Sequence, residues 1–202
     1  MSRRKLAYGV GINDWCTNIS NGSSKHIPEY KMWLRMLERS LSEKWKADNP
    51  TYKDVSVDPA WHSMTTFIND VSTLVGYEQA ITNGWHLDKD LLVKGNKLYS
   101  KDTCCFLPIE INSLMVMHRS NRGVYPSGVH FRKRQPKRPY GAVVRTGGII
   151  KTLGSYATPE EAFYVYKEAK EAYIKEVANK WKDQIDIRAY EALMMYEVEI
   201  TD

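Results

Sequence analysis

The sequence predicts an α+β protein built in two parts, and three patterns support this prediction. Apolar residues recur at helical spacing in the first third of the chain. A strand–turn–strand–helix order follows in residues 85–117. Three short β-prone runs then precede a helix-capping sequence, which favours a three-stranded antiparallel sheet packed on one helix. The length of 202 residues is enough for two such domains.

The first part begins with a helical lead. After the segment Tyr8-Gly9-Val10-Gly11-Ile12-Asn13-Asp14, a helix is expected to start near Pro28 and to end before Asp48-Asn49-Pro50. Residues 52–57 form an extended run, and a second helix is expected from Pro59. The apolar faces of the two helices consist of Met32, Trp33, Met36, Leu37 and Leu41, and of Trp61, Met64, Phe67, Ile68 and Val71.

The middle of the chain combines strands with a third helix. Residues 85–92 are expected to be extended, Lys94-Gly95-Asn96 forms a turn, and residues 103–107 are β-prone. A helix then starts at Pro108 and turns Ile111, Leu114 and Met115 inward. We place the first domain at residues 1–120.

The second domain, residues 121–202, follows a linker at Asn121-Arg122-Gly123. Its strands are expected at residues 128–132, 140–145 and 149–154, with turns rich in proline and glycine between them. Thr158-Pro159-Glu160-Glu161 is a capping box that starts a helix reaching about Trp181, and a last helix is expected at residues 187–198.

Charge is distributed unevenly along the chain. The net charge of +5 is the sum of +1 in residues 1–110, +9 in residues 111–159 and −5 in residues 160–202. The central block has no aspartate or glutamate, and its basic side chains fall on the expected strands. Such a block attracts phosphates, so nucleic acid is the first partner to consider. The alternative is a solvated basic loop without a partner.

Composition excludes several other classes of protein. A hydrophobic content of 43% is too high for a disordered tail, and no apolar run is long enough to span a membrane. The start of the chain lacks the apolar stretch of a signal peptide, so we expect a cytoplasmic protein. The three cysteines, Cys16, Cys104 and Cys105, favour neither a disulfide nor a zinc site and are expected to be free thiols.

Residues 125–167 contain the patterns G-V-x-F, Y-x-A-x-V, L-G-x-Y and T-P-E-E-A in this order. This arrangement resembles the ethylene-response-factor (Apetala) DNA-binding domain, in which a three-stranded sheet backed by a helix reads the major groove of double-stranded DNA. The resemblance implies that strand arginines contact guanine edges or phosphates and that a strand lysine contacts phosphates. It implies that loop residues hold the DNA backbone. The strand residues would be Arg132, Arg134, Arg145 and Lys151, and the loop residues Lys133, Lys137 and Arg138.

A second set of short patterns lies in the middle of the chain: Leu87-Asp88-Lys89-Asp90, Gly95-Asn96, Tyr99-Ser100, Thr103-Cys104-Cys105-Phe106 and Asn112. Together they resemble the HNH endonuclease core found beside such DNA-binding domains in bacteriophage proteins. The resemblance implies an HNH-like ββα core that cleaves phosphodiesters with a divalent metal such as Mg²⁺. Asp88 and Asn112 would hold the metal. If the protein is encoded by a phage, the cytoplasm in which it acts would be that of the host.

Two departures from that pattern leave the activity open. Lys89 stands where the general-base histidine is expected, and Thr103 replaces an asparagine that pins the loop. A protonated lysine cannot accept a proton, so Lys89 could serve as a phosphate clamp while another group acts as the base. His86, two residues before Asp88 on the same strand face, is the best substitute, unless it is a structural histidine. The alternative is a core that no longer cuts and instead occupies DNA or blocks a host protein. The sequence predicts no oligomeric state.

Overall fold

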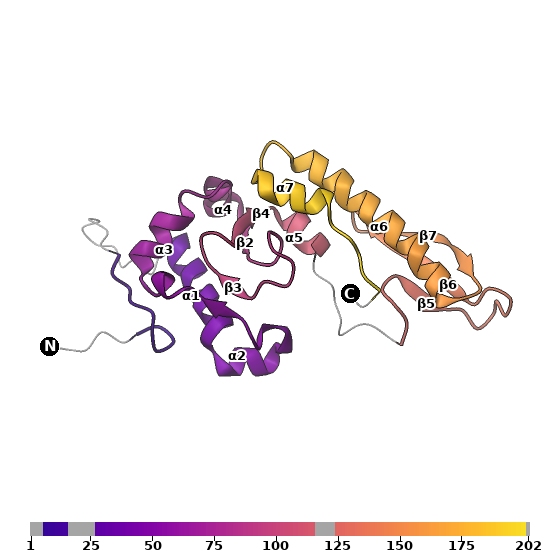
Figure 1. Cartoon of the computed structure of the whole chain (residues 1–202), viewed down its shortest axis with the longest axis horizontal. Helices are drawn as coiled ribbons and strands as arrows, with labels where there is room; N and C mark the ends of the chain where they lie inside the picture. Colours follow the sequence, from indigo (N-terminus) through magenta and orange to yellow (C-terminus); the bar gives the residue numbers. More distant parts are fainter. Residues whose placement is uncertain (1–5, 16–26, 116–123, 201–202) are drawn as a thin grey trace. The chain divides into compact units, whose positions relative to one another are not determined.

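The structure, a computed structural model of the whole chain, describes residues 6–15, 27–115 and 124–200. Helices and strands are both present, including a three-stranded antiparallel sheet, so the predicted α+β class is confirmed (Figure 1). The chain divides into two compact units, which are described separately. The first unit consists of Met1–Ile109 with Gln184–Ala189, and the second of Glu110–Asp183 with Tyr190–Asp202.

Short helices make up most of the first unit. Serine side chains set two of their boundaries, which apolar spacing alone does not show. Ser42 is extended and its hydroxyl accepts a hydrogen bond from the Trp45 amide, so the first predicted helix is divided in two. Ser63 accepts in the same way from Thr66 and separates a 3-10 turn from the second predicted helix. The helical elements are α1 (Pro28–Leu41), α2 (Glu43–Asp48), η2 (Pro50–Tyr52), η3 (Pro59–His62), α3 (Met64–Val71) and α4 (Tyr77–Asn83).

The N-terminal segment is fixed to this helical core by close packing and by hydrogen bonds, including two backbone bonds of Ile12 to His62 and Met64. A Cβ at Gly11 would lie 2.6 Å from Leu37 Cδ1 and 2.9 Å from Trp33 Cη2, so only glycine allows this close approach. Asp14 accepts hydrogen bonds from the Ser63 hydroxyl at 2.7 Å and from the Thr65 amide at 2.9 Å, and so helps to cap α3. Residues 11–14 therefore serve packing and capping.

Two small two-stranded sheets complete the first unit. β1 (Ser56–Val57) pairs in parallel with β3 (Leu98–Tyr99), and β2 (His86–Asp88) pairs antiparallel with β4 (Cys105–Leu107). The predicted extended run 85–92 is thus a strand only over its first residues. Asp88 Oδ1 accepts hydrogen bonds from the amides of Asp90 and Leu91, and this turn ends the strand.

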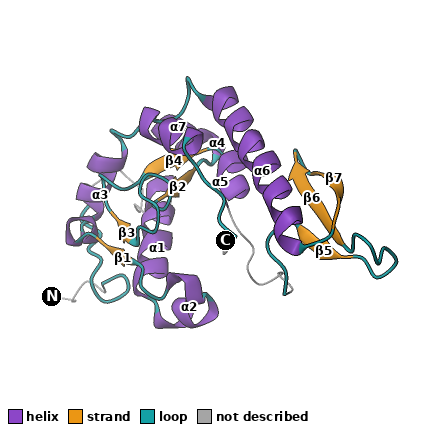
Figure 2. Cartoon of the chain, turned by 45° about the vertical axis from the view of Figure 1, so that its right-hand side comes forward, coloured by secondary structure: helices purple, strands orange, loops and turns teal. Residues whose placement is uncertain are grey.

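The second unit contains the predicted sheet and its covering helix (Figure 2). The strands β5 (Val129–Phe131), β6 (Tyr140–Thr146) and β7 (Ile149–Tyr156) are antiparallel in this spatial order, and α6 (Pro159–Trp181) packs on one face of them. The capping box at the start of α6 is present: the Thr158 hydroxyl accepts from the Glu161 amide, and the Glu161 carboxylate accepts from the Thr158 amide. The final helix is α7 (Ile187–Met194).

Helix α5 (Ile109–Met115) belongs almost entirely to the second unit. Glu110 accepts hydrogen bonds from Lys180 Nζ at 2.6 Å and from Trp181 Nε1 at 2.8 Å, and Lys170 Nζ donates to the Leu114 carbonyl. These contacts tie α5 to α6. The division between the units therefore differs from the one predicted after residue 120, and the predicted linker 121–123 lies outside the described residues. Within the described ranges, no helix has the length and apolar character that a membrane crossing requires.

Candidate functional site

The three-stranded sheet presents one face to α6 and one face away from it. Ala142 and Val144 are fully or almost fully buried under α6, so the residues that alternate with them in β6 point to the opposite face. Directly paired residues of neighbouring strands share a face. The outer face, the name we use below for the side turned away from α6, is therefore made by His130, Gly141, Val143, Arg145, Ile150, Thr152 and Ser155.

The structure places the predicted strand cations at three different positions. Arg145 is exposed on the outer face. Lys151 is also exposed, but it pairs with Val144 and so projects on the α6 side of the sheet. Arg132 and Arg134 were predicted on a strand, yet β5 ends at Phe131 and both residues lie in the following loop.

Arg132 nevertheless lies across the outer face, because two side chains, those of His130 and Ser155, hold it there. Its Nε donates to His130 Nε2 at 2.8 Å, and its Nη1 donates to the Ser155 hydroxyl at 3.0 Å. The Ser155 hydroxyl in turn donates to Gln135 Oε1 at 2.9 Å. Gly141 leaves room for these two side chains, because a Cβ at this position would lie 2.5 Å from Arg132 Nε and 2.6 Å from the His130 ring. Partial burial, with a smaller contribution from the Arg132 charge, lowers the pKa of His130.

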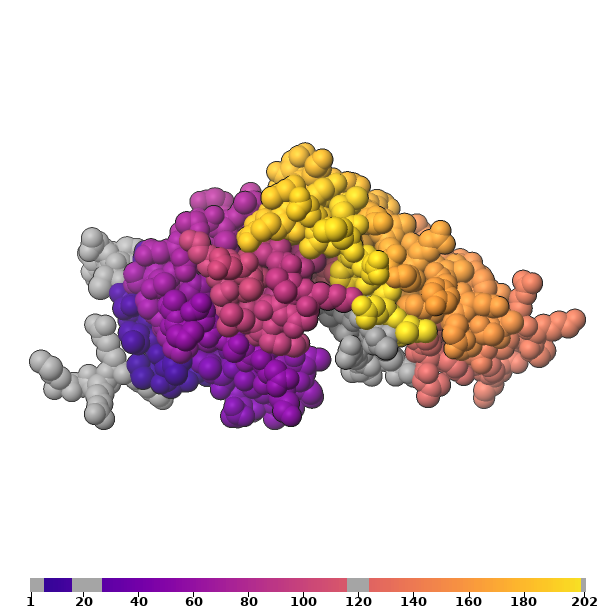
Figure 3. Space-filling view, viewed as in Figure 1, coloured from indigo at the N-terminus to yellow at the C-terminus, as the bar shows by residue number. Residues whose placement is uncertain are grey.

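The loop between β5 and β6, residues 132–139, extends the basic surface beyond the sheet. Three backbone hydrogen bonds fold it: the Arg132 amide donates to the Pro139 carbonyl, the Gln135 amide to the Arg132 carbonyl and the Arg138 amide to the Gln135 carbonyl. The segment projects from the end of the sheet in the space-filling view (Figure 3). The four predicted loop and strand-end cations in it are all exposed: Lys133, Arg134, Lys137 and Arg138.

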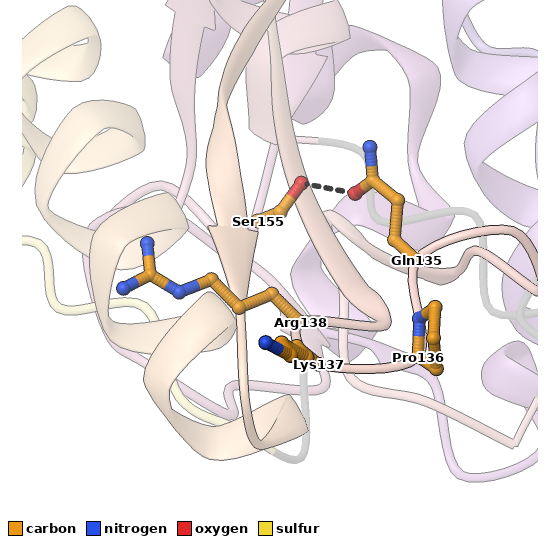
Figure 4. A pocket seen from close by; sticks show the side chains of 5 residues that line it. All are labelled: Gln135, Pro136, Lys137, Arg138 and Ser155. Atoms are coloured by element: carbon orange, nitrogen blue, oxygen red, sulfur yellow. Dashed lines mark hydrogen bonds between the residues drawn. The ribbon is translucent and has the colours of Figure 1, made fainter.

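An open hollow of about 600 Å³ lies where this loop meets β7 (Figure 4). Gln135, Pro136, Lys137, Arg138 and Ser155 line it. The Ser155–Gln135 hydrogen bond joins the strand to the loop in the same view. The hollow therefore adjoins the residues that hold Arg132, and two cations border it.

The first unit contains the predicted cleavage residues on β2. His86 and Asp88 are two residues apart in this strand and project to the same face. Partial burial and the nearby charges of Arg39 and Arg35 lower the pKa of His86, against a smaller opposing contribution from Asp88. His86 is thus neutral at pH 7 and able to accept a proton. Arg35 and Arg39, on α1, were not singled out from the sequence, since nothing local to β2 points to them.

Asp88 provides a carboxylate suited to a cation. Burial, more than the neighbouring Asp90 charge, raises its pKa, although backbone hydrogen bonds to its Oδ1 oppose this. A bound cation would relieve both effects, so Asp88 fits one ligand position of Mg²⁺, which commonly takes one or two carboxylates and keeps several waters. Asn112, the other predicted ligand, lies on α5 in the second unit, and the metal pair stays a prediction. Among the described residues, no three or more histidine, cysteine, aspartate or glutamate side chains form a group that could hold a metal.

Lys89 is buried, which disagrees with its expected role as a phosphate clamp. Its side chain is 3% exposed, and its Nζ lies 2.6 Å from both carboxylate oxygens of Asp90. The same ammonium lies 5.5 Å from the ring centroids of Tyr52 and Tyr99. Lys89 therefore packs the first unit and does not present its charge to a ligand.

Substitution of Lys89 separates this packing role from a role of its charge. Lys89→Met keeps most of the buried volume and leaves Asp90, whose side chain is 53% exposed, to be solvated by water. We expect it to change the free energy of unfolding by less than about 1 kcal/mol. Lys89→Ala leaves a cavity and is expected to cost about 3 kcal/mol. Urea unfolding of both variants measures the difference, and equal costs would contradict the packing role.

The loop before β4 is pinned by two side chains. Asn96 Nδ2 donates to the carbonyls of Lys89 and Leu98 at 2.7 and 2.8 Å. Thr103 Oγ1 donates to the Leu98 carbonyl at 2.7 Å. Thr103 thus still holds this loop although it replaces the expected asparagine. The longer side chain of Asn96 also bonds to the Lys89 carbonyl, which is seven residues away.

The cysteines take no part in the candidate site. Cys104 and Cys105 are both buried free thiols, as expected, and Cys105 is the strand partner of Asp88. Burial is the main cause that raises the pKa of Cys104, to about 12, and it also raises that of Cys105. Both thiols are therefore protonated and unsuited to metal binding at neutral pH. Cys16 lies outside the described residues.

We compared the chain with protein-family models, with curated proteins and with solved structures, and found no match. The function proposed below therefore comes from the geometry and charge of this chain together with the two resemblances in its sequence.

Proposed function

We propose that this protein binds double-stranded DNA with the outer face of its three-stranded sheet and the adjoining loop. The observation that carries the proposal is the position of two arginines: Arg145 is exposed on the outer face, and Arg132 is held across it by hydrogen bonds. Residues 111–159 include no carboxylate, and they contain the whole three-stranded sheet and only the first residue of α6. A phosphate backbone can therefore approach this face without repulsion.

The shape of the surface is compatible with a duplex. The major groove of B-DNA is about 12 Å wide and admits a β-ribbon, and arginine can donate two hydrogen bonds to a guanine edge. Arg132 and Arg145 are the side chains on the outer face with this capacity. The four exposed cations of the loop are suited to phosphate contacts, which position a protein on DNA. Lys151, on the other side of the sheet, adds only to the surrounding positive field.

Binding to a labelled duplex at increasing salt tests this function. Each phosphate contact contributes about −0.9 to the slope of log affinity against log salt, so three or four contacts give a slope of about −3. We expect affinity to fall steeply between 50 and 200 mM salt. An affinity that does not change with salt would contradict DNA binding by this basic surface.

We propose cleavage of the bound DNA as a second function. His86 and Asp88 share one face of β2, and His86 is neutral at pH 7. Asp88 would hold Mg²⁺, which when bound supplies a Lewis acid for the phosphate oxygen. His86 would accept a proton from the attacking water at a ring nitrogen. The burial of Lys89, which occupies the base position of the resemblance, favours His86 over Lys89 in this role.

The alternative is a DNA-binding protein without cleavage, one that occupies DNA or blocks a host protein. A buried ammonium at the base position favours this alternative if His86 does not act. Plasmid nicking in the presence of Mg²⁺ or Mn²⁺ separates the two functions, because both predict binding and only one predicts a nicked product. In either case we propose the cytoplasm, where a phage protein would meet DNA, as the site of action.

A further inference from the structure

The hydrogen bond between Arg132 and His130 requires one protonation state of the histidine. Arginine nitrogens only donate, so His130 Nε2 must be an unprotonated acceptor for the 2.8 Å contact with Arg132 Nε. An imidazolium at this position has no acceptor and places a second positive charge beside the guanidinium. The contact is therefore broken when His130 takes up a proton.

The remaining partners of Arg132 do not titrate. Ser155 donates its hydroxyl proton to Gln135, which leaves its oxygen to accept from Arg132 Nη1. On the neighbouring strand, His130 faces Gly141, which has no side chain. Among the described residues, Arg132 is the charged group that acts on the pKa of His130. His130 is thus the titratable member of this cluster.

We propose that His130 and Ser155 are positioning residues that fix Arg132 on the outer face, and that protonation of His130 releases it. This inference rests on the proposed DNA-binding function and adds its regulation. With His130 neutral, Arg132 is held in one orientation and is ready to contact a base edge at little entropic cost. With His130 charged, Arg132 is no longer held in this orientation, and the imidazolium adds one cation that can contact a phosphate.

The two states differ in how binding responds to salt. Protonation adds one cation to the surface, so the slope of log affinity against log salt becomes steeper by about one. The effect appears as the pH falls through the pKa of His130, which lies below its ordinary value of 6.5 because of partial burial and the Arg132 charge. Above that pH the positioned state prevails.

NMR of the full chain without DNA tests the positioning directly. The quantity to measure is the protection factor of Arg132 Nε–H, which is the exchange rate of a free arginine at the same pH divided by the rate in the protein. In the wild type this factor should be well above one at pH 7.5 and should fall toward one as His130 titrates toward pH 5. His130→Gln supplies an amide oxygen that accepts a hydrogen bond and does not titrate, so its protection factor should stay high at both pH values, whereas that of His130→Ala should be near one at both. Loss of protection in His130→Gln at pH 7.5, or protection that persists in the wild type after titration, would overturn the proposal.

Duplex binding by the same proteins tests the consequence. Between pH 7.5 and pH 5, the salt slope of the wild type for a random-sequence duplex should steepen by about one, and that of His130→Gln should not change. Equal changes in both proteins would overturn the inference while leaving DNA binding intact. Absence of salt-dependent binding at either pH would refute the proposed function. The NMR experiment, which uses no DNA, would still show whether His130 positions Arg132.

Discussion

Simultaneous replacement of Arg132 and Arg145 by alanine is expected to weaken binding to duplex DNA about 100-fold. An arginine contact to a base or phosphate contributes about 1 to 3 kcal/mol, and a loss of about 1.4 kcal/mol is tenfold in affinity. Two independent losses therefore multiply to about two orders of magnitude. Fluorescence anisotropy with a labelled duplex at fixed salt measures the change, and a salt titration should show a slope less steep by up to two.

Matched charge removals distinguish contact from a general loss of positive charge. Lys175, on α6, and Lys182, which follows it, are both exposed, and their double alanine variant removes the same formal charge. We expect that variant to reduce affinity less than about threefold. Lys151→Ala tests the two faces of the sheet, because Lys151 lies on the α6 side and should matter less than Arg145. If the Arg132/Arg145 variant bound as tightly as the Lys175/Lys182 variant, the outer face would not be the contact surface.

His86→Ala is expected to lower plasmid nicking about a thousandfold at pH 7.5 in Mg²⁺. General-base catalysis typically contributes a factor of about 10² to 10⁴, and His86 is the neutral imidazole beside Asp88. Asp88→Asn should also abolish nicking, because it removes the negative charge available to the metal. Asparagine keeps an oxygen that can accept from the amides of Asp90 and Leu91, so this variant should fold like the wild type.

His62→Ala serves as the control for removal of a histidine. His62 lies in η3, away from β2 in the sequence, and its variant is expected to nick at the wild-type rate. Duplex affinity should be unchanged in both histidine variants, since the proposed contacts are in the second unit. A wild-type protein that binds duplex but produces no nicked plasmid with Mg²⁺ or Mn²⁺ would establish the alternative without cleavage.

Local sequence patterns predicted the elements well where the deciding interactions were also local. Thr158 and Glu161 are three residues apart, and the helix they cap starts where expected. Strand β6 likewise covers Tyr140–Thr146, where a strand was expected at residues 140–145. Such elements depend on contacts between residues only a few positions apart, which a single sequence displays directly.

The candidate sites were harder to predict because distant residues determine them. Lys89 is enclosed by Tyr52 and Tyr99, which belong to different segments, so its burial could not be read from the strand pattern. Arg132 bonds to Ser155, which is 23 residues away. The spacing of His130 and Arg132 was a usable signal, since residues two apart in extended chain share a face. Arg132 was expected on a strand, and its placement in the loop shows that the strand ended earlier.

The central claim, that the outer face of the sheet contacts DNA, is tested most directly by backbone amide chemical shifts of the full chain during titration with a duplex. Val143, Arg145 and Thr152 mark the outer face, and Ile174 and Val177 mark the buried side of α6. The account predicts that the largest shift changes occur at the first three residues and in the loop 132–139, with little change at the last two. Shift changes concentrated on α6 or in the first unit, with none on the outer face, would contradict it.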